Sequence, residues 1–148
     1  MTKALIGAGC FWSIEEYYRK LPGIINTKVG YSGGHTKNPT YEDVCTGITE
    51  HAEVVQIEFD TKIISYKEIL DHFGLCHDPT QLNKQGHDVG RQYRSAIFYF
   101  SNDQKISAVL AKKKIQLSIS NLIVTEISPA KEFYLAEDYH QLYFFKRA

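Results

Sequence analysis

Cys10 stands between a glycine-containing stretch and a run of helix-forming residues, where a cysteine can act as a nucleophile. Free backbone amides and the helix dipole at a helix N-terminus stabilise an anion. We therefore expect the pKa of Cys10 to fall from about 8.5 into the range of roughly 3.5–7.5. The alternative is a small buried core residue without chemistry. Phe11 and Trp12 follow directly and predict an apolar pocket beside the sulfur.

Glu53 is the second candidate, because alternation along a predicted strand over 52–59 places it on the face of Val55 and Ile57. If this face is buried, desolvation disfavours the charged carboxylate and raises the pKa of Glu53. A carboxyl group that stays protonated at neutral pH can donate a proton. The alternative is that Glu53 lies just beyond the sheet and faces solvent.

Two tyrosines in polar segments, Tyr41 and Tyr93, complete the candidate site. A phenol in an apolar pocket presents an O–H donor without bringing a charge. Either one could instead pack in the core or lie on the surface, since the chain has ten tyrosines. The combination of a thiol, a neutral acid, phenolic donors and an aromatic wall is typical of an active site.

The elements that must position these residues alternate along the chain. Apolar spacing and capping residues predict strands at 3–6, 24–31, 52–59, 94–100 and 122–127, and helices from about 11 to 21, from 65 to about 77 and from 101 to about 119. The segment 32–51 is polar and rich in glycine, which predicts a long, largely irregular loop, and the segment 78–92 reads as a second polar, glycine-bearing loop. The order β-α-β-β-α-β-α-β predicts an α/β sandwich with a mixed sheet, related to ferredoxin-like topologies. A chain of 148 residues is expected to form one domain, residues 1–148.

Composition argues against several classes of function. The 17 basic and 17 acidic side chains cancel, so a nucleic-acid or membrane-surface partner has little electrostatic support. No segment approaches the roughly 18 apolar residues of a membrane span, and we expect a soluble, cytoplasmic protein. Cys10, Cys45 and Cys76 are too few and too widely spaced for a disulfide framework or a zinc site. The histidines lack ligand spacing, so no metal site is expected.

Short motifs run in order from residue 7 to about residue 143. They are Gly9-Cys10-Phe11-Trp12, Gly30-Tyr31-Ser32-Gly33-Gly34, Asn38-Pro39-Thr40-Tyr41-Glu42, Val44-Cys45-Thr46-Gly47, His51-Ala52-Glu53, His77-Asp78-Pro79, Gln92-Tyr93-Arg94-Ser95 and Ala136-Glu137-Asp138-Tyr139-His140-Gln141. Together they resemble the peptide methionine sulfoxide reductase A family. The resemblance implies the α/β roll (α+β) of that family, which is compatible with the element order.

The resemblance also implies an activity and a set of catalytic residues. The activity is thiol-dependent reduction of the S epimer of methionine sulfoxide, protein-bound and also free, as repair of oxidative damage. Cys10 would attack the sulfoxide sulfur and become a sulfenic acid. Glu53, Tyr41 and Tyr93 would bind the sulfoxide oxygen, so that the sulfur becomes electrophilic.

Further residues follow from the resemblance for substrate binding. Phe11 and Trp12 would form the pocket for the substrate methyl group, and Asp88 would help to hold the substrate backbone. Glu50 stands where the family usually has glycine, and His87 and Arg91 replace residues that are commonly Asn and Thr. These departures affect loop geometry and the substrate rim.

The partners that the resemblance implies are oxidised proteins or peptides and an external thiol reductant, thioredoxin-like or glutaredoxin-like, with no bound cofactor. Many members resolve the oxidised nucleophile with cysteines in a C-terminal tail, which this sequence does not show. Cys45 occupies a position that is structural in the family. Cys76 therefore remains as a candidate resolving residue, and the other possibility is an enzyme that uses Cys10 alone.

The sequence fits other classes of function less well. A binding module could use Phe11, Trp12, Tyr41 and Tyr93 as an aromatic cage for a methylated ammonium group, and it would need no thiol. A thiol phosphatase needs an arginine that closes a phosphate loop soon after the nucleophile, whereas residue 16 is Glu. A thiol protease needs a histidine base, and no histidine here lies in a protease motif.

Overall fold

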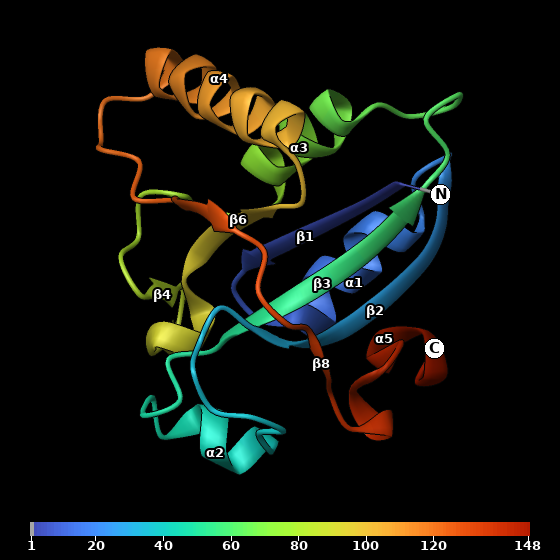
Figure 1. The fold of residues 1–148 in the computed structure, drawn as a ribbon, viewed down its shortest axis with the longest axis vertical. Helices are drawn as coiled ribbons and strands as arrows, with labels where there is room; N and C mark the ends of the chain where they lie inside the picture. Colours follow the sequence, from blue (N-terminus) through green and yellow to red (C-terminus); the bar gives the residue numbers. More distant parts are fainter. Residues whose placement is uncertain (1) are drawn as a thin grey trace.

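The computed structural model describes residues 2–148 and is built around one sheet of six strands (Figure 1). The strands lie in the order β7-β6-β1-β3-β2-β8. Their bounds are β1 (Thr2–Ala8), β2 (Ile24–Ser32), β3 (Ala52–Phe59), β6 (Ser95–Tyr99), β7 (Glu126–Pro129) and β8 (Tyr134–Leu135). A separate hairpin pairs β4 (Lys84–Gln85) with β5 (Asp88–Val89). The helices are α1 (Phe11–Arg19), α2 (Tyr41–Cys45), α3 (Tyr66–Cys76), α4 (Asn102–Ser118) and α5 (Tyr143–Lys146), with 3-10 turns η1 (Arg91–Tyr93) and η2 (Asp138–His140).

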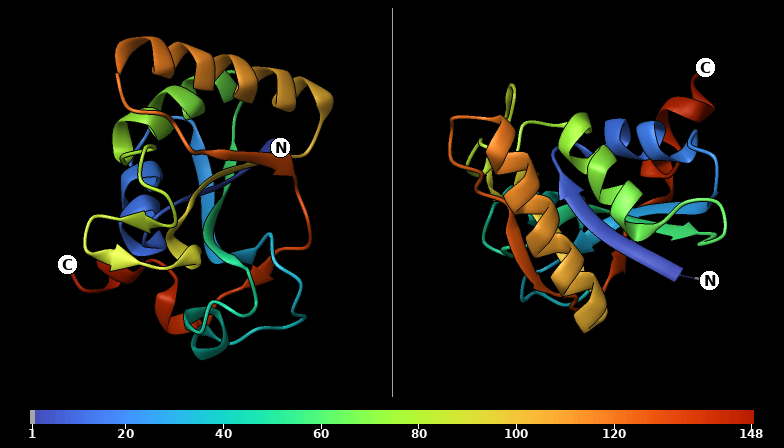
Figure 2. Two further views of the ribbon diagram at one scale, coloured as in Figure 1. Left: turned by 90° about the vertical axis from the view of Figure 1, so that its left-hand side faces the viewer. Right: turned by 90° about the horizontal axis from the view of Figure 1, so that it is seen from above.

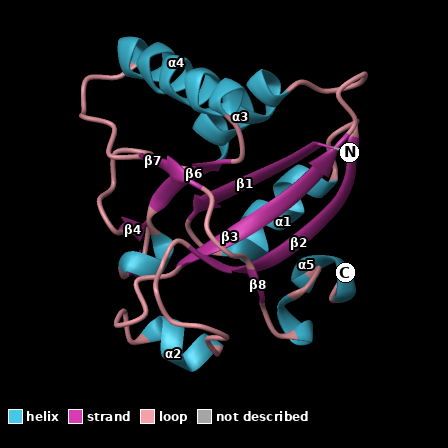
Figure 3. Cartoon of the chain, in the orientation of Figure 1, coloured by secondary structure: helices cyan, strands magenta, loops and turns pink. Residues whose placement is uncertain are grey.

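The central strands follow a β-α-β-β-α-β path, which confirms the predicted relation to ferredoxin-like topologies. Helix α1 connects β1 to β2, and β3 lies between these two strands, antiparallel to both. Helix α3 leads to β6, which pairs antiparallel with the other edge of β1. Strand β7 adds to β6 in parallel, so the sheet is mixed, as predicted. The arrangement of helices and strands is visible in Figure 3.

The main core lies between the sheet and its helices. Apolar residues of α1, α3 and α4 pack against alternate residues of β1, β2, β3 and β6. Figure 2 shows α1 and α3 on the same side of the sheet. The opposite face carries a smaller cluster around Leu5, Val54 and Phe98, which is covered by Ala130 and Phe133. No helix among residues 2–148 is long and apolar enough to cross a membrane.

The helix boundaries agree with local sequence signals. Gly9 takes φ +96°, a left-handed value that favours glycine, and lets the chain turn from β1 into α1. An ideal Cβ at Gly9 would lie 2.8 Å from Cγ of Gln85, so the hairpin also approaches closely there. Ser65 opens α3 with the predicted capping box to Glu68. Ser101 caps α4 by accepting the Gln104 amide.

Two loop predictions were incomplete and one strand prediction was wrong. The largely irregular segment 32–51 also contains α2, which a capping box between Thr40 and Asp43 opens. The loop 78–92 contains the short β4–β5 hairpin. The strand predicted at 122–127 begins only at Glu126. Residues before it bond elsewhere, since the Val124 amide donates to the Pro79 carbonyl and the Thr125 carbonyl accepts from the Lys112 ammonium.

Candidate active site

The end of β1 and the neighbouring strand β3 bring Cys10 and Glu53 together. Cys10 is the N-cap residue of α1 and is half-buried. Glu53 faces the core side of β3 and is only 2% exposed, which excludes the solvent-facing alternative. Its Oε1 accepts a hydrogen bond from the Phe11 amide at 3.2 Å. The carboxyl group is therefore tied to the first residue of the helix that Cys10 caps.

Burial raises the pKa of Glu53 to about 8, while the Phe11 amide opposes the shift and the negative charge of Asp88 adds to it. This confirms the predicted direction. Glu53 is mostly protonated at neutral pH and can act as a proton donor.

The pKa of Cys10 is raised to about 11, so the expected lowering was wrong. Burial is the largest cause, and it outweighs the helix amides of Trp12 and Ser13, which favour the thiolate. The charges of Glu53 and Asp88 raise the pKa further. Cys10 is thus a protonated thiol at neutral pH, and two neutral acids stand side by side.

Tyr41 and Tyr93 come from α2 and from the end of η1, and both are half-buried. Burial raises the pKa of Tyr93 to about 12, and the charge of Glu53 raises it too, which places this phenol near the carboxyl group. Burial also raises the pKa of Tyr41, and the neighbouring Cys45, Tyr93 and Glu53 raise it further. The structure therefore places both predicted phenols, in their neutral form, near Glu53.

Aromatic rings form the wall of the site. Phe11 is 1% exposed, and its ring centroid lies 5.8 Å from that of Tyr31. The Trp12 ring is stacked on Tyr143, with centroids 3.7 Å apart and planes 7° apart. These contacts place two aromatic side chains next to Cys10, and the apolar pocket beside the sulfur stays a prediction.

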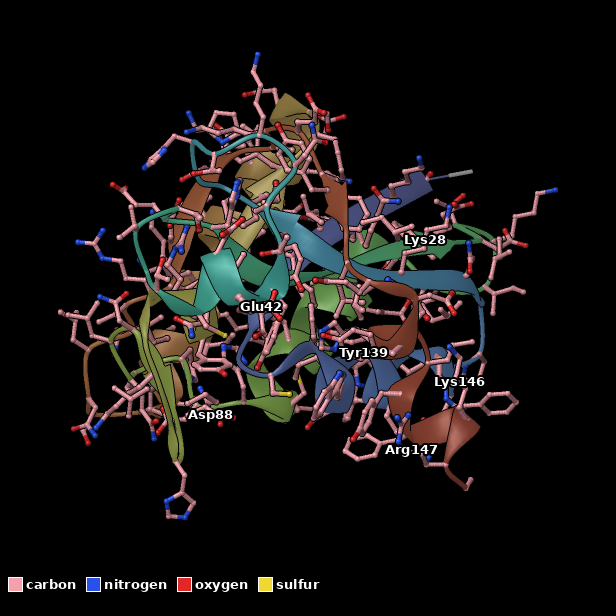
Figure 4. All side chains as sticks on the ribbon, turned by 90° about the horizontal axis from the view of Figure 1, so that it is seen from below. Lys28, Glu42, Asp88, Tyr139, Lys146 and Arg147 are labelled. Atoms are coloured by element: carbon pink, nitrogen blue, oxygen red, sulfur yellow. The ribbon has the colours of Figure 1, made fainter. Side chains whose placement is uncertain are left out.

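Asp88 lies on the exposed hairpin strand β5, and its charge acts on both Cys10 and Glu53. Figure 4 views this end of the molecule and labels Asp88 on the hairpin, Glu42 on α2 and Tyr139 on the C-terminal segment. The three labelled residues come from separate segments and lie around the same end. Asp88 is thus an exposed carboxylate at the end of the molecule that carries Cys10 and Glu53.

Sequence reasoning assigned no role to Glu137 and His140. Glu137 accepts hydrogen bonds from the Tyr41 amide and from the Tyr31 hydroxyl, each at 2.8 Å. His140 is 1% exposed, and its Nδ1 accepts the indole N–H of Trp12 at 2.9 Å. The available signal was the dense polar and aromatic motif 136–141, in a segment without clear periodicity.

Comparisons with known proteins match nearly the whole chain. A family model described as peptide methionine sulfoxide reductase matches residues 2–148. The peptide methionine sulfoxide reductase MsrA of Methanothermobacter thermautotrophicus is 54% identical over 143 residues, which cover 95% of this chain and 85% of that protein. The crystal structure of Mxr1 from Saccharomyces cerevisiae in reduced form has a TM-score of 0.94 and 40% identity, covering 98% of this chain and 84% of that chain. Mxr1 in complex with Trx2 matches with a TM-score of 0.66 and 28% identity, covering 96% of this chain and 84% of that chain.

Proposed function

The chain belongs to the peptide methionine sulfoxide reductase family, and on this basis we propose how its own residues reduce methionine sulfoxide. The enzyme is an oxidoreductase that reduces methionine sulfoxide in a thiol-dependent reaction. The observation that carries the assignment of residues is the pairing of the Cys10 thiol with a buried, protonated Glu53.

Glu53, Tyr41 and Tyr93 bind the sulfoxide oxygen. The S–O bond is a strong dipole with negative oxygen, and the three groups supply O–H donors without adding charge. A buried acceptor without donors costs about 1–3 kcal/mol, so the oxygen has one favourable orientation in the site. Hydrogen bonds to the oxygen leave the sulfur more positive and open to attack.

Cys10 then attacks the substrate sulfur, and the protons of the Cys10 thiol and the Glu53 carboxyl group pass to the oxygen, which leaves as water. A second water molecule adds its oxygen to the Cys10 sulfur, the thioether departs, and one proton returns to Glu53. The product is methionine, and Cys10 is left as a sulfenic acid. The substrate sulfur gains two electrons and the Cys10 sulfur loses two.

Phe11 and Trp12 form the surface against which the substrate methyl group packs. Burial of one methyl group against aromatic rings contributes only about 1–2 kcal/mol. With the oxygen donors on one side and this wall on the other, one epimer places both groups correctly. We assign the S epimer, which the family resemblance implies, and we assign Asp88 to the substrate backbone because it is exposed at the rim.

A thioredoxin-like or glutaredoxin-like protein is the proposed reductant, supported by the similarity to Mxr1, which was crystallised in complex with Trx2.

Cys76 is a poor candidate for resolving the sulfenic acid. Its Sγ–H donates to the Phe73 carbonyl at 3.5 Å, and burial raises its pKa to about 12. Cys45, in contrast, is exposed. We expect Cys76→Ser to keep thioredoxin-dependent turnover, and Cys45→Ser measured in parallel shows whether the exposed thiol contributes.

The cytoplasmic location is likewise a proposal. Cys10, Cys45 and Cys76 are all free thiols in the structure, which fits a reducing compartment.

The test of the function compares wild type with Cys10→Ser and Glu53→Gln, using each epimer of a methionine sulfoxide peptide and dithiothreitol as reductant. We expect wild type to consume one epimer, Cys10→Ser to be inactive, and Glu53→Gln to lose about 100-fold in kcat/KM. The aromatic-cage alternative has no support in the comparisons, and it requires ligand binding that does not depend on the thiol. Equal turnover of both epimers, or activity without Cys10, would refute the assignment.

A further inference from the structure

Trp12 is held by a set of contacts from the C-terminal segment. Nδ1 of His140 accepts the indole N–H at 2.9 Å, and the Tyr143 ring stacks on the indole face. Arg147 lies over the other ring of this pair, with its guanidinium carbon 3.6 Å from the Tyr143 centroid. Figure 4 labels Tyr139 and Arg147 on this segment. One edge and one face of the indole are therefore fixed by residues more than 120 positions away in the sequence.

His140 is itself rigidly placed. It is 1% exposed, and its ring lies 5.1 Å from Phe11, 4.8 Å from Tyr41 and 4.1 Å from Tyr139, measured between ring centroids. The His140 amide donates to the Glu137 carbonyl at 2.9 Å. Glu137 in turn accepts from the Tyr41 amide. The imidazole thus occupies a fixed point between the helix that carries Trp12 and the helix that carries Tyr41.

The second ring nitrogen of His140, Nε2, has no hydrogen-bond partner within residues 2–148. Because Nδ1 accepts a hydrogen bond from Trp12, the proton of the neutral ring lies on Nε2, and Nε2 is buried without a partner among the described residues. A buried N–H without an acceptor destabilises the fold. The unpaired Nε2–H of His140 therefore lowers the free energy of unfolding, whereas Nδ1 supplies a specific hydrogen-bond acceptor to Trp12.

We propose that His140 is a positioning residue that sets the orientation of Trp12 through Nδ1 and thereby the fit of the substrate methyl group. This inference rests on the proposed function, in which Trp12 forms the methyl pocket. It follows that removal of the acceptor loosens the pocket wall, weakens the preference for a methyl over an ethyl sulfoxide and leaves the oxygen-binding residues in place.

The experiment uses three substitutions that differ in where they place an acceptor. His140→Asn keeps an amide oxygen near the position of Nδ1, His140→Gln moves it toward the position of Nε2, and His140→Leu has none. The readout is kcat/KM for a methyl sulfoxide and for its ethyl analogue. We expect His140→Leu to lose on the order of three- to tenfold with the methyl substrate and to lose most of the methyl preference. His140→Asn is expected to retain both.

A spectroscopic measurement tests the contact directly, since Trp12 is the single tryptophan of the chain. Its indole N–H gives one identifiable NMR resonance, which we expect to be shifted downfield and slow to exchange in wild type and His140→Asn. In His140→Leu it should move upfield and exchange faster. If His140→Leu fails to fold, the Asn and Gln variants and the coupling between Trp12 Nε1 and His140 Nδ1 in wild type still decide the question.

A double-mutant cycle with Trp12→Phe separates positioning from direct substrate contact. If His140 acts through Trp12, then His140→Leu adds little in the Trp12→Phe background. The proposal is overturned if the two losses multiply, if Gln rescues and Asn does not, or if His140→Leu keeps the methyl preference of wild type. A wild-type enzyme that shows no methyl preference at all would instead contradict the proposed role of Trp12.

Discussion

Cys10 and Glu53 each carry one proton at neutral pH, and the sulfoxide oxygen must receive two protons to leave as water. The pKa of Cys10 is raised to about 11 and that of Glu53 to about 8, both mainly by burial. The thiolate is the reactive form of cysteine, so Cys10 must lose its proton as it attacks the substrate sulfur. Because its pKa is raised, this proton is still on the sulfur when the neutral sulfoxide binds, and it can pass to the sulfoxide oxygen.

The activity should decline as pH rises through about 8. Below this value Glu53 is protonated and can donate to the oxygen, and above it the carboxylate repels the oxygen and supplies no proton. The measurement is the pH profile of kcat/KM in wild type and in Glu53→Gln, which should be slower and flat across this range. An increase through pH 8 in wild type would show that the reactive state has already lost a proton.

Glu50 takes φ +61°, a left-handed conformation that is costly for a residue with a side chain. Within residues 2–148 its side chain makes only weak contacts, since its Oε1 lies 3.8 Å from nitrogens of His35 and Arg91, and all three side chains are exposed. We predict that Glu50→Gly raises the free energy of unfolding by about 1 kcal/mol. Urea denaturation checks this, with exposed Glu132→Gly as control, for which no gain is expected. A loss of stability in Glu50→Gly would mean that the ion pairs outweigh the strain.

The elements divide into those that local patterns determine and those that distant contacts determine. The strand over 52–59 and the helix that Ser65 caps were predictable, because alternation and capping boxes are local signals. Helix α2 was missed although Thr40 and Asp43 carry a readable capping box, since the surrounding composition is typical of a loop. The predicted direction of the Cys10 pKa shift was wrong because the burial of the thiol depends on tertiary packing, which no local sequence pattern contains.

The C-terminal segment is the clearest case of an element without a local signal. The side chain of Gln141 accepts the Val29 amide at 2.9 Å and donates to the Val29 carbonyl at 2.8 Å, as a neighbouring strand would. The Leu142 amide donates to the buried carboxyl group of Glu15 at 2.7 Å. Beyond the short pairing of β8 with β2 and the bond from the Ala136 amide to the Val29 carbonyl, side chains fix this segment to β2 and α1.

Glu137→Gln tests how strongly this segment braces α2. The two oxygens of Glu137 each accept a hydrogen bond, whereas a glutamine presents one acceptor and one donor. In Glu137→Gln, either the Tyr41 amide faces an N–H group and is unpaired, or the Tyr31 hydroxyl must turn to accept instead of donate. We predict a loss of about 1–3 kcal/mol in the free energy of unfolding, with a lower kcat/KM because Tyr41 is displaced. Denaturation and kinetics measure both, and Glu132→Gln at an exposed position is the matched control. An unchanged variant would show that the brace is dispensable.

At the scale of the whole molecule, the site is assembled from segments that are far apart in sequence. Cys10 follows β1, Tyr41 begins α2, Glu53 lies in β3, Tyr93 ends η1 and His140 ends η2. Each of these side chains needs the folded sheet and the docked C-terminal segment to reach the others. The expectation that residues 1–148 form one domain stays a prediction, which a single cooperative unfolding transition would support.

Buried titratable groups should give the whole fold a stability plateau in mildly acidic solution. The pKa of His77 is lowered by burial from 6.5 to about 4, so the unfolded chain binds a proton that the folded chain does not between these values. Stability from His77 is therefore present above pH 6.5 and is lost as pH falls toward 4.

The pKa of Glu53 is raised from 4.5 to about 8, so its contribution is present below pH 4.5 and is lost as pH rises toward 8. Between 4.5 and 6.5 the two slopes cancel. Above 6.5 only the loss from Glu53 remains, at up to about 1.4 kcal/mol per pH unit. We predict that wild type is less stable at pH 8 than at pH 6, as measured by urea denaturation, and that Glu53→Gln removes this decline. A decline that persists in Glu53→Gln would assign it to another group.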